Sequence, residues 1–414
     1  MASVRRLEFR RYDYAAFAAF TVYAICSLII PMVLVQMGRD LGFPLDQGGL
    51  ASGGGLHLSR SAVMVVALLS CGVIGARFGN RFAMGGALLA MGAGIVGCGL
   101  TSAYWMLFPL LAIAGVGEGV CEGLATPFVQ KLHPDAPERY VNLAHSFWSV
   151  GIAVCVLLSG VLIAFGVSWR VVMVGAGILA ALASLGFLWH EDTQHPYPET
   201  TRVGGSGEVW KKSKEIFRSG KFWLYCFGMF VGAGAEFCLT FWAASFLQLN
   251  FNTGVLIAGV GTAAIAFGMF VGRAFFGWIA TESNLKWILL WSSLGTIPVT
   301  LTLGFIRPEH FPSTAWMVGA LLVLLLLCGV GIAPYWPTLQ VYGVKNLPHL
   351  DDTLLYIYFS AVGIPGCGFF TYLVGALGNR YGLDGAFRLI PATLLVYAAI
   401  IFIDAWLLKS TRQK

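Results

Sequence analysis

Two glutamates four residues apart, Glu118 and Glu122, lie inside an otherwise uncharged apolar run, residues 106–129. The run is about 24 residues long, enough to cross a bilayer as a helix. At this spacing both carboxylates lie on one helix face. Because a carboxylate facing lipid is costly, we expect that face to line a bundle interior or a water-filled cavity. The alternative is a glycine-packed helix whose acids only pair with a neighbouring cation.

Arg60 is the charged residue of the second apolar run, and its depth matches that of Glu118. Counted from the side of the membrane opposite the N-terminus, the depths of Arg60 and Glu118 agree within about 3–5 Å at the helical rise per residue. We predict an ion pair between them, which protonation of Glu118 would break. His57 lies three residues before Arg60, on the same face. These three residues are the candidates for proton coupling, with a static ion pair and a packed, hydrogen-bonded histidine as alternatives.

Glu236 is the lone charge of the seventh apolar run, flanked by Gly232, Gly234 and Trp242. An acid beside an aromatic ring suits a polyol, because the carboxylate accepts hydroxyl hydrogen bonds and the ring stacks on the apolar sugar face. We therefore take Glu236 and Trp242 as candidate substrate contacts. A packing pair between Glu236 and another helix is the alternative.

Two prolines, Pro334 and Pro337, interrupt the tenth apolar run. Prolines free backbone carbonyls and allow a helix to bend. The side chains around this break, Tyr335, Trp336 and Gln340, are therefore candidates for lining a substrate cavity. A kinked helix anchored at the membrane interface is the alternative interpretation.

The composition is that of a membrane protein with many spans. The chain has 414 residues, of which 57% are hydrophobic and 11% charged, whereas a soluble domain carries about 25% charged residues. Nine scattered cysteines form no metal-binding spacing, and the glycine repeat at 115–119 follows no strand, as a nucleotide fingerprint would. We expect no metal, no cofactor, no nucleic-acid partner and no enzymatic activity, and we read the net charge of +6 as membrane topology.

Apolar runs predict twelve membrane-spanning helices in an all-α fold, at residues 14–37, 50–76, 84–102, 106–129, 142–167, 171–188, 222–247, 253–279, 285–306, 314–341, 353–378 and 386–408. The long polar segment 189–221 separates six of them from the other six, and its later part, 210–218, is typical of an amphipathic helix on the membrane surface. We divide the chain into a six-helix bundle (1–188), a cytoplasmic linker (189–221) and a second six-helix bundle (222–414).

The positive charges predict how the chain is oriented. If the N-terminus is cytoplasmic, twenty of the 26 lysines and arginines fall in inner segments and five in outer loops, with Arg60 inside a span. Lysine and arginine accumulate on the cytoplasmic side of membrane proteins. We therefore expect a multi-pass protein of the cell membrane, the inner membrane if the source is bacterial, with both termini in the cytoplasm.

The two halves repeat one feature at corresponding positions. Segment 72–81, with Arg77 and Arg81, closes the second helix, and segment 268–277, with Arg273, closes the eighth. Small residues and a cation at equivalent helix ends indicate a parallel repeat of two six-helix units.

Segment 72–81 resembles the loop motif of the major facilitator superfamily, with Ala76 where the motif has an acid. The resemblance extends over nearly the whole chain and implies that superfamily's fold of two six-helix repeats. It also implies gating at the cytoplasmic side by Arg77, Arg81 and Arg273.

Further segments resemble the fucose–proton symporter family, namely 47–50, 122–127, 142–151, 232–242 and 363–382. This resemblance implies a sugar site with contacts from Glu122, His145, Glu236 and Trp242. The chain departs from the family in its first helix, which has no acid between residues 14 and 37, where a membrane aspartate would be expected.

These observations predict a monomeric secondary active transporter, specifically a proton-coupled symporter of a sugar or similar small polar solute. Substrate would bind near mid-membrane between the halves, which would rock around it. Two alternatives stay open. One is a facilitator or exporter of a lipid-like or drug-like solute, and the other is a non-transporting membrane sensor of the same fold.

Overall fold

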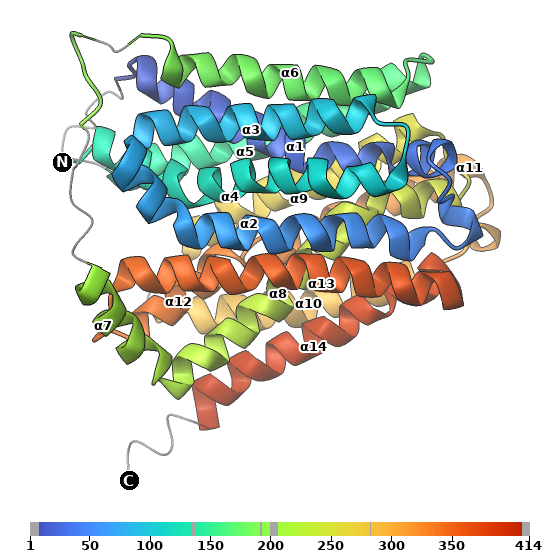
Figure 1. The fold of residues 1–414 in the computed structure, drawn as a ribbon. Helices are drawn as coiled ribbons and strands as arrows, with labels where there is room; N and C mark the ends of the chain where they lie inside the picture. The colour runs from blue at the N-terminus through green and yellow to red at the C-terminus, as the bar shows by residue number, and fades with distance from the viewer. Residues whose placement is uncertain (1–7, 135–136, 191–192, 199–205, 282, 408–414) are drawn as a thin grey trace.

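The structure is a computed structural model that describes residues 8–134, 137–190, 193–198, 206–281 and 283–407. Within these residues it consists of helices and connecting turns, without strands (Figure 1), which confirms the all-α fold class. The helices are α1 (Arg11–Asp40), α2 (Leu50–Phe78), α3 (Asn80–Leu100), α4 (Leu107–Leu132), α5 (Pro137–Ala164), α6 (Trp169–Leu188), α7 (Ser206–Phe217), α8 (Gly220–Asn250), α9 (Val255–Ile279), α10 (Leu285–Phe305), α11 (Thr314–Ile332), α12 (Pro337–Lys345), α13 (Asp352–Phe387) and α14 (Leu389–Phe402).

The described helices supply the twelve predicted membrane spans. Eleven are long and apolar enough to cross a bilayer, and a shorter apolar helix, Leu389–Ala405, supplies the last. The tenth span is divided into α11 and α12 by a turn, and Pro337 is the first residue of α12. A proline is well placed at a helix start because its missing N–H is not needed there.

In the described part of the polar segment between α6 and α8 there is one helix, α7, where an amphipathic helix was predicted. Its Lys212 forms an ion pair of 3.1 Å with Asp351, which precedes α13. Ser213 hydrogen-bonds to the hydroxyl of Tyr358 on α13 at 2.6 Å. One face of α7 is therefore docked on α13. Residues 191–192 and 199–205 of the predicted linker lie outside the described residues.

Two sides of the molecule can be defined from the chain path. The terminal side is where α1 begins and α14 ends, together with α7, at the left of Figure 1. The far side is where α1 ends and α2 begins. We call α1–α6 the first half and α8–α14 the second half; in Figure 1, α6, α3 and α4 of the first half lie above α13, α8 and α14 of the second.

Toward the far side the halves touch along a seam of small residues. A Cβ built on Gly54 of α2 would lie 2.8 Å from the carbonyl oxygen of Thr371 on α13, and one on Gly259 of α9 would lie 2.6 Å from the carbonyl oxygen of Val156 on α5. The backbone N–H of Leu50, at the start of α2, donates to Asn379 Oδ1 of α13 at 3.0 Å. Glycine permits this approach because it has no side chain to separate the helices.

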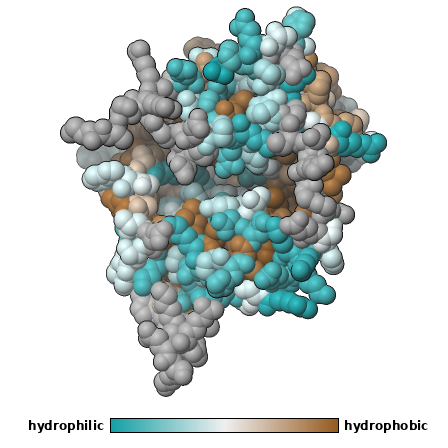
Figure 2. Space-filling view, turned by 90° about the vertical axis from the view of Figure 1, so that its left-hand side faces the viewer, coloured by the Kyte–Doolittle hydropathy of each residue, from teal (hydrophilic) through white to brown (hydrophobic). Residues whose placement is uncertain are grey.

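Toward the terminal side the halves are separated. The space-filling view of this side shows a recess between an upper and a lower group of side chains (Figure 2). His145 of α5 is exposed, and Arg273 of α9 has 31% of its side chain exposed, although both lie on membrane-spanning helices. We call this recess the cleft. The structure therefore has a closed far side and an open terminal side.

Candidate functional site

Three residues one turn apart on α4 form a stripe, and each contacts a different helix of the first half. Glu118 pairs with Arg60 of α2, Glu122 accepts a hydrogen bond from Tyr23 of α1, and Thr126 hydrogen-bonds to His145 of α5. The four-residue spacing places them on one face, as the sequence predicted for the two acids. We call these three residues the α4 stripe.

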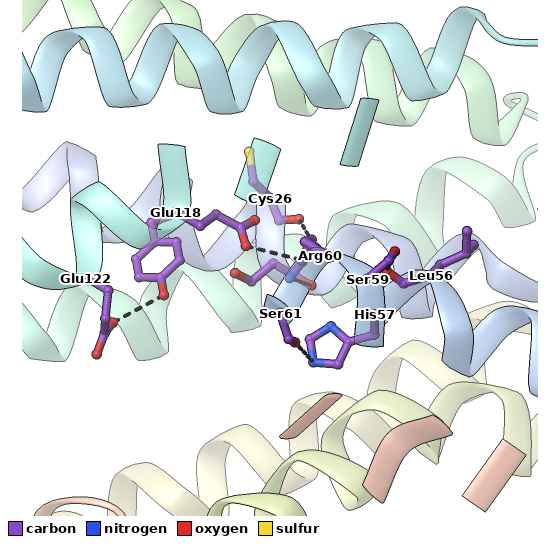
Figure 3. Close-up of polar contacts among 10 residues, drawn as sticks. Cys26, Leu56, His57, Ser59, Arg60, Ser61, Glu118 and Glu122 are labelled. Atoms are coloured by element: carbon purple, nitrogen blue, oxygen red, sulfur yellow. Dashed lines mark hydrogen bonds and ion pairs between the residues drawn. The ribbon is translucent and has the colours of Figure 1, made fainter. Parts of the chain in front are cut away.

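The Arg60–Glu118 ion pair predicted from the sequence is confirmed. Arg60 Nε lies 3.1 Å from Glu118 Oε2, and the side chains are 3% and 0% exposed (Figure 3). The guanidinium also donates to the carbonyl oxygens of Cys26 and Ser27 on α1, at 3.5 and 3.3 Å. The pair therefore ties α2, α4 and α1 together at a point closed to the cleft.

Two glycines bring α2 and α4 close enough for this pair. A Cβ on Gly115 would lie 2.9 Å from the carbonyl oxygen of Arg60, and a Cβ on Gly119 would come within 2.2 Å of the carbonyl oxygen of Met64. Any larger residue at either position would push the helices apart. The glycines around the acids therefore serve helix approach, as the alternative interpretation of this run expected.

His57 does not join the ion pair. Its Nε2 lies 3.4 Å from Ser61 Oγ, and its ring stacks on Phe237 of α8 with centroids 4.3 Å apart and planes 4° from parallel. At 7% exposure it is buried. The geometry is that of a packed, hydrogen-bonded histidine, here at a contact between the two halves.

Glu122 occupies a different environment from Glu118, although only one turn separates them. The Tyr23 hydroxyl donates to Glu122 Oε2 at 3.2 Å (Figure 3), and the carboxylate side chain is partly exposed. Among the described residues no lysine, arginine or histidine nitrogen lies within ion-pair distance of it. Glu122 is therefore a carboxylate without a cationic partner near the cleft.

His145 lies at the cleft end of the α4 stripe. Its Nε2 is 2.9 Å from Thr126 Oγ1, its ring packs against Phe20 of α1 at 4.7 Å, and the residue is exposed. The stripe thus runs from a sealed acid, Glu118, through the partly exposed Glu122 to Thr126, which bonds to the exposed His145.

In the second half, Glu236 and Arg273 form an ion pair. Arg273 Nη2 lies 3.1 Å from Glu236 Oε1, with 31% and 13% of the respective side chains exposed. The sequence assigned one residue to substrate and the other to gating at a helix end, and it did not predict their contact. A packing pair between Glu236 and another helix was the alternative interpretation of this residue, and the structure shows such a pair with Arg273 of α9.

Trp242 requires a correction, because its ring is not available to a sugar in this conformation. The side chain is fully buried, its Nε1 donates to the carbonyl oxygen of Thr371 at 3.1 Å, and a Cβ on Gly375 would lie 3.1 Å from the ring. The ring fills the interface between α8 and α13. The helix turns this face of the seventh span away from the cleft, which spacing from Glu236 did not reveal.

The residues around the break between α11 and α12 are also held by neighbours. Tyr335 is 1% exposed and its ring lies 4.8 Å from that of Tyr397 on α14. Gln340 Nε2 donates to Ser360 Oγ of α13 at 3.0 Å and is buried. Trp336 remains partly exposed. Of the three cavity candidates, therefore, Tyr335 and Gln340 pack inside the second half.

The candidate gating arginines of the first half lie at the terminal side. Arg77 is exposed in the last turn of α2. Arg81 is 8% exposed and its Nη1 donates to the carbonyl oxygen of Phe187 on α6 at 3.0 Å. Arg81 thus binds within the first half in this conformation.

The sequence analysis missed three groups of polar residues. Tyr23 was not singled out because a tyrosine in an apolar run is usually packing. Asp404 lies in the last predicted span, where its charge was a signal, and it binds Lys221 at 3.1 Å and the hydroxyls of Tyr225 and Tyr342 at 2.9 and 2.7 Å. At the terminal end of the first half, Asp13 Oδ1 lies 2.5 Å from His133 Nε2.

The described helices form a bundle of apolar spans in two halves, which is the architecture of a membrane transporter. The Major Facilitator Superfamily profile matches residues 15–367. The chain belongs to this superfamily and is a multi-pass membrane transporter of its fold. No match to a curated protein sequence was found.

Solved structures agree with this fold at low sequence identity. A D-xylose–proton symporter is 13% identical, with a TM-score of 0.74, covering 94% of this chain and 96% of that chain. The E. coli fucose:proton symporter is 17% identical, with a TM-score of 0.63, covering 95% and 98%. A bacterial homolog of the human lysosomal transporter Spinster, in an inward-facing and occupied conformation, is 17% identical, with a TM-score of 0.69, covering 95% and 96%.

Proposed function

We propose that the chain is a proton-coupled symporter of a sugar or a similar small polar solute. The observation that carries the proposal is the pair of partly exposed carboxylates on membrane spans, Glu122 in the first half and Glu236 in the second. Carboxylates accept hydrogen bonds from hydroxyl groups, and a substrate held from both halves would couple binding to their movement.

The proposed substrate contacts are side chains with exposed surface at the cleft. From the first half these are Glu122, Thr126 and His145, and from the second half Glu236 and Arg273. Together they offer acceptors and donors to a molecule with several hydroxyl groups. The pair joins Arg273 Nη2 to Glu236 Oε1, and 31% of the Arg273 side chain is exposed, so its guanidinium can also donate to substrate.

The proposed proton carrier is Glu118. Ionised, it pairs with Arg60 and helps hold α1, α2 and α4 together. Protonated, it would lose the charge interaction and release the guanidinium, so protonation would change the packing of the first half. Both residues of this sealed pair, Arg60 and Glu118, must move for the guanidinium to be released. This requirement links the proton to a conformational step.

We also propose that the terminal side is cytoplasmic, as the distribution of lysine and arginine favours. The cleft then opens to the cytoplasm, and the seam between the halves closes the outer side. Transport would proceed by rocking the halves, 1–188 and 222–414, around the bound substrate.

The test is uptake by the purified, full-length protein in lipid vesicles, against a panel of labelled sugars and polyols, with and without an inward proton gradient. We expect at least one sugar to accumulate when the gradient is applied, and we expect a protonophore to abolish that accumulation. Uptake that is equal with and without the gradient would overturn the coupling. Transport of lipid-like solutes alone, or of no solute, would support one of the two alternatives.

A further inference from the structure

The membrane part of α1 carries no acid, yet α1 reaches the α4 stripe through one phenol. Tyr23 is 5% exposed, and its hydroxyl donates to Glu122 Oε2 at 3.2 Å. Its ring packs edge-on against Trp148 of α5, with centroids 4.5 Å apart and an interplanar angle of 65°. Packing against the indole fixes the ring, and the fixed ring aims the hydroxyl at the carboxylate.

We propose that Tyr23 is a positioning residue that keeps Glu122 ionised and oriented for substrate. This inference rests on the proposed role of Glu122 as a substrate contact. A phenol O–H is a donor to an ionised carboxylate oxygen and stabilises that charged form. The protonated acid would accept fewer hydroxyl hydrogen bonds, so the phenol maintains the form that binds a polyol.

Among the residues that the structure describes, no cation forms an ion pair with Glu122, so its charged form depends on the hydrogen bond from Tyr23. Glu118 is one turn away and its charge is already taken by Arg60. The packed side of α3 offers Ala87 and Met91 to α4. The titratable groups that interact with Glu122 are Tyr23 on α1, Cys121 on α4 and Cys367 on α13. The cations of the neighbouring helices contact other groups: Arg60 of α2 pairs with Glu118, His145 of α5 bonds to Thr126 and Arg273 of α9 pairs with Glu236.

Removing the hydroxyl alone separates this role from packing. Tyr23→Phe keeps the ring against Trp148 and leaves Glu122 without its donor. A hydrogen bond to a charged group corresponds to a shift of about one to two pH units in the titration of its acceptor. We therefore expect Glu122 to hold its proton up to a pH about one to two units higher in the variant.

The measurement is modification by a hydrophobic carbodiimide, which adds to protonated buried carboxyl groups, across a pH series in detergent. Peptide fragmentation in the mass spectrometer distinguishes Glu122 from Glu118, and Glu122→Gln identifies the signal. Because the experiment needs no substrate, its result is independent of whether the proposed transport activity is right.

The matched control is Tyr12→Phe, which removes a buried phenol hydroxyl from the same helix at the terminal side, where the ring contacts Phe128 and Tyr197. We expect the Glu122 labelling curve to move to higher pH in Tyr23→Phe and to stay in place in Tyr12→Phe. An unchanged curve in Tyr23→Phe, or an equal movement in both variants, would overturn the proposal and leave Tyr23 as a packing residue.

Discussion

The acidic residues inside the membrane differ in what surrounds them more than in their sequence context. Glu118 is sealed against Arg60, Glu122 has a phenol donor and partial exposure, and Glu236 shares a partly exposed ion pair with Arg273. A carboxylate that is sealed and paired suits a conformational role, whereas one at the cleft suits contact with a solute. We therefore expect substitutions of Glu118 and of Glu122 to cause different defects in transport.

Glu118→Gln and Glu122→Gln separate coupling from binding. Glu118→Gln mimics the protonated state, so counterflow exchange should persist while accumulation driven by a proton gradient is lost. Glu122→Gln should weaken binding by about tenfold to hundredfold, because a charge-assisted hydrogen bond is worth about 1.5–3 kcal/mol. Uptake and counterflow in the same vesicles measure both. If Glu118→Gln still accumulates substrate when the gradient is applied, Glu118 is a static structural partner and not the carrier.

Trp242 belongs to the packing between α8 and α13, so its loss should act on stability first. Trp242→Ala removes a fully buried ring and its hydrogen bond to Thr371. Large-to-small core changes of this kind cost about 3–5 kcal/mol. We expect a lower melting temperature in detergent and, in protein that remains folded, little change in substrate affinity. A stable variant that loses affinity would restore the ring to the binding site.

At the scale of elements, the helices divide into those that close the seam and those that carry the charges. α2 does both, since Arg60 lies in its interior and its first turns pack on α13 through Gly54 and Leu50. His57, between these positions, stacks on Phe237 of α8. A change in the Arg60–Glu118 ion pair can therefore be transmitted to the seam through the short part of α2 between Arg60 and Gly54.

Gly54→Val should open the seam. A Cβ at this position would meet the Thr371 carbonyl oxygen at 2.8 Å and the Tyr372 Cα at 2.8 Å, and neither can move without moving α13. We expect more frequent opening of the far side, measured as faster modification of a cysteine introduced at Leu50, whose side chain is 5% exposed and whose backbone N–H keeps the bond to Asn379. The matched control is Gly55→Ala, where the added Cβ would sit 3.9 Å from the Tyr372 ring. Equal modification rates in both variants would contradict a role for the Gly54 contact in closure.

At the scale of the whole molecule, the far side is closed by the contacts of Gly54 and Gly259, and the terminal side is open (Figure 2). The seam on the closed side consists of glycine contacts and uncharged hydrogen bonds, such as Leu50 to Asn379 and Gln36 to Gln248. Weak, close packing of this kind can separate and re-form without exposing unpaired charges. The architecture is consistent with two halves that rock about a central site.

Cysteine labelling in intact cells tests the orientation of this structure. The nine native cysteines are buried, so labelling from them should be low. Ser213 is an unsuitable position because it is 3% exposed and bonded to Tyr358, whereas Lys214 and Pro308 are exposed on opposite sides. We expect a membrane-impermeant reagent to label Pro308→Cys from outside, and Lys214→Cys only after permeabilisation. The reverse pattern would invert the proposed topology.

The sequence by itself determined the number of spans, the stripe of acids on α4 and the Arg60–Glu118 pair. The length of an apolar run indicates a bilayer crossing, and the spacing of residues along a helix indicates whether they share a face. The depths of two charged residues in their runs indicate whether they can form a pair. It did not determine the rotation of each helix about its axis. Lipid and protein interior are similarly apolar, so hydropathy does not show which face meets protein, lipid or water.

Only the tertiary structure decided the partners that depend on this rotation. It turned Trp242 into the interface with α13, joined Glu236 to Arg273 and aimed Tyr23 at Glu122. Each of these contacts joins residues from different helices that are tens of residues or more apart in the chain. Such pairs become neighbours only when several helices pack together, because close approach is set by small residues on every packed face at once.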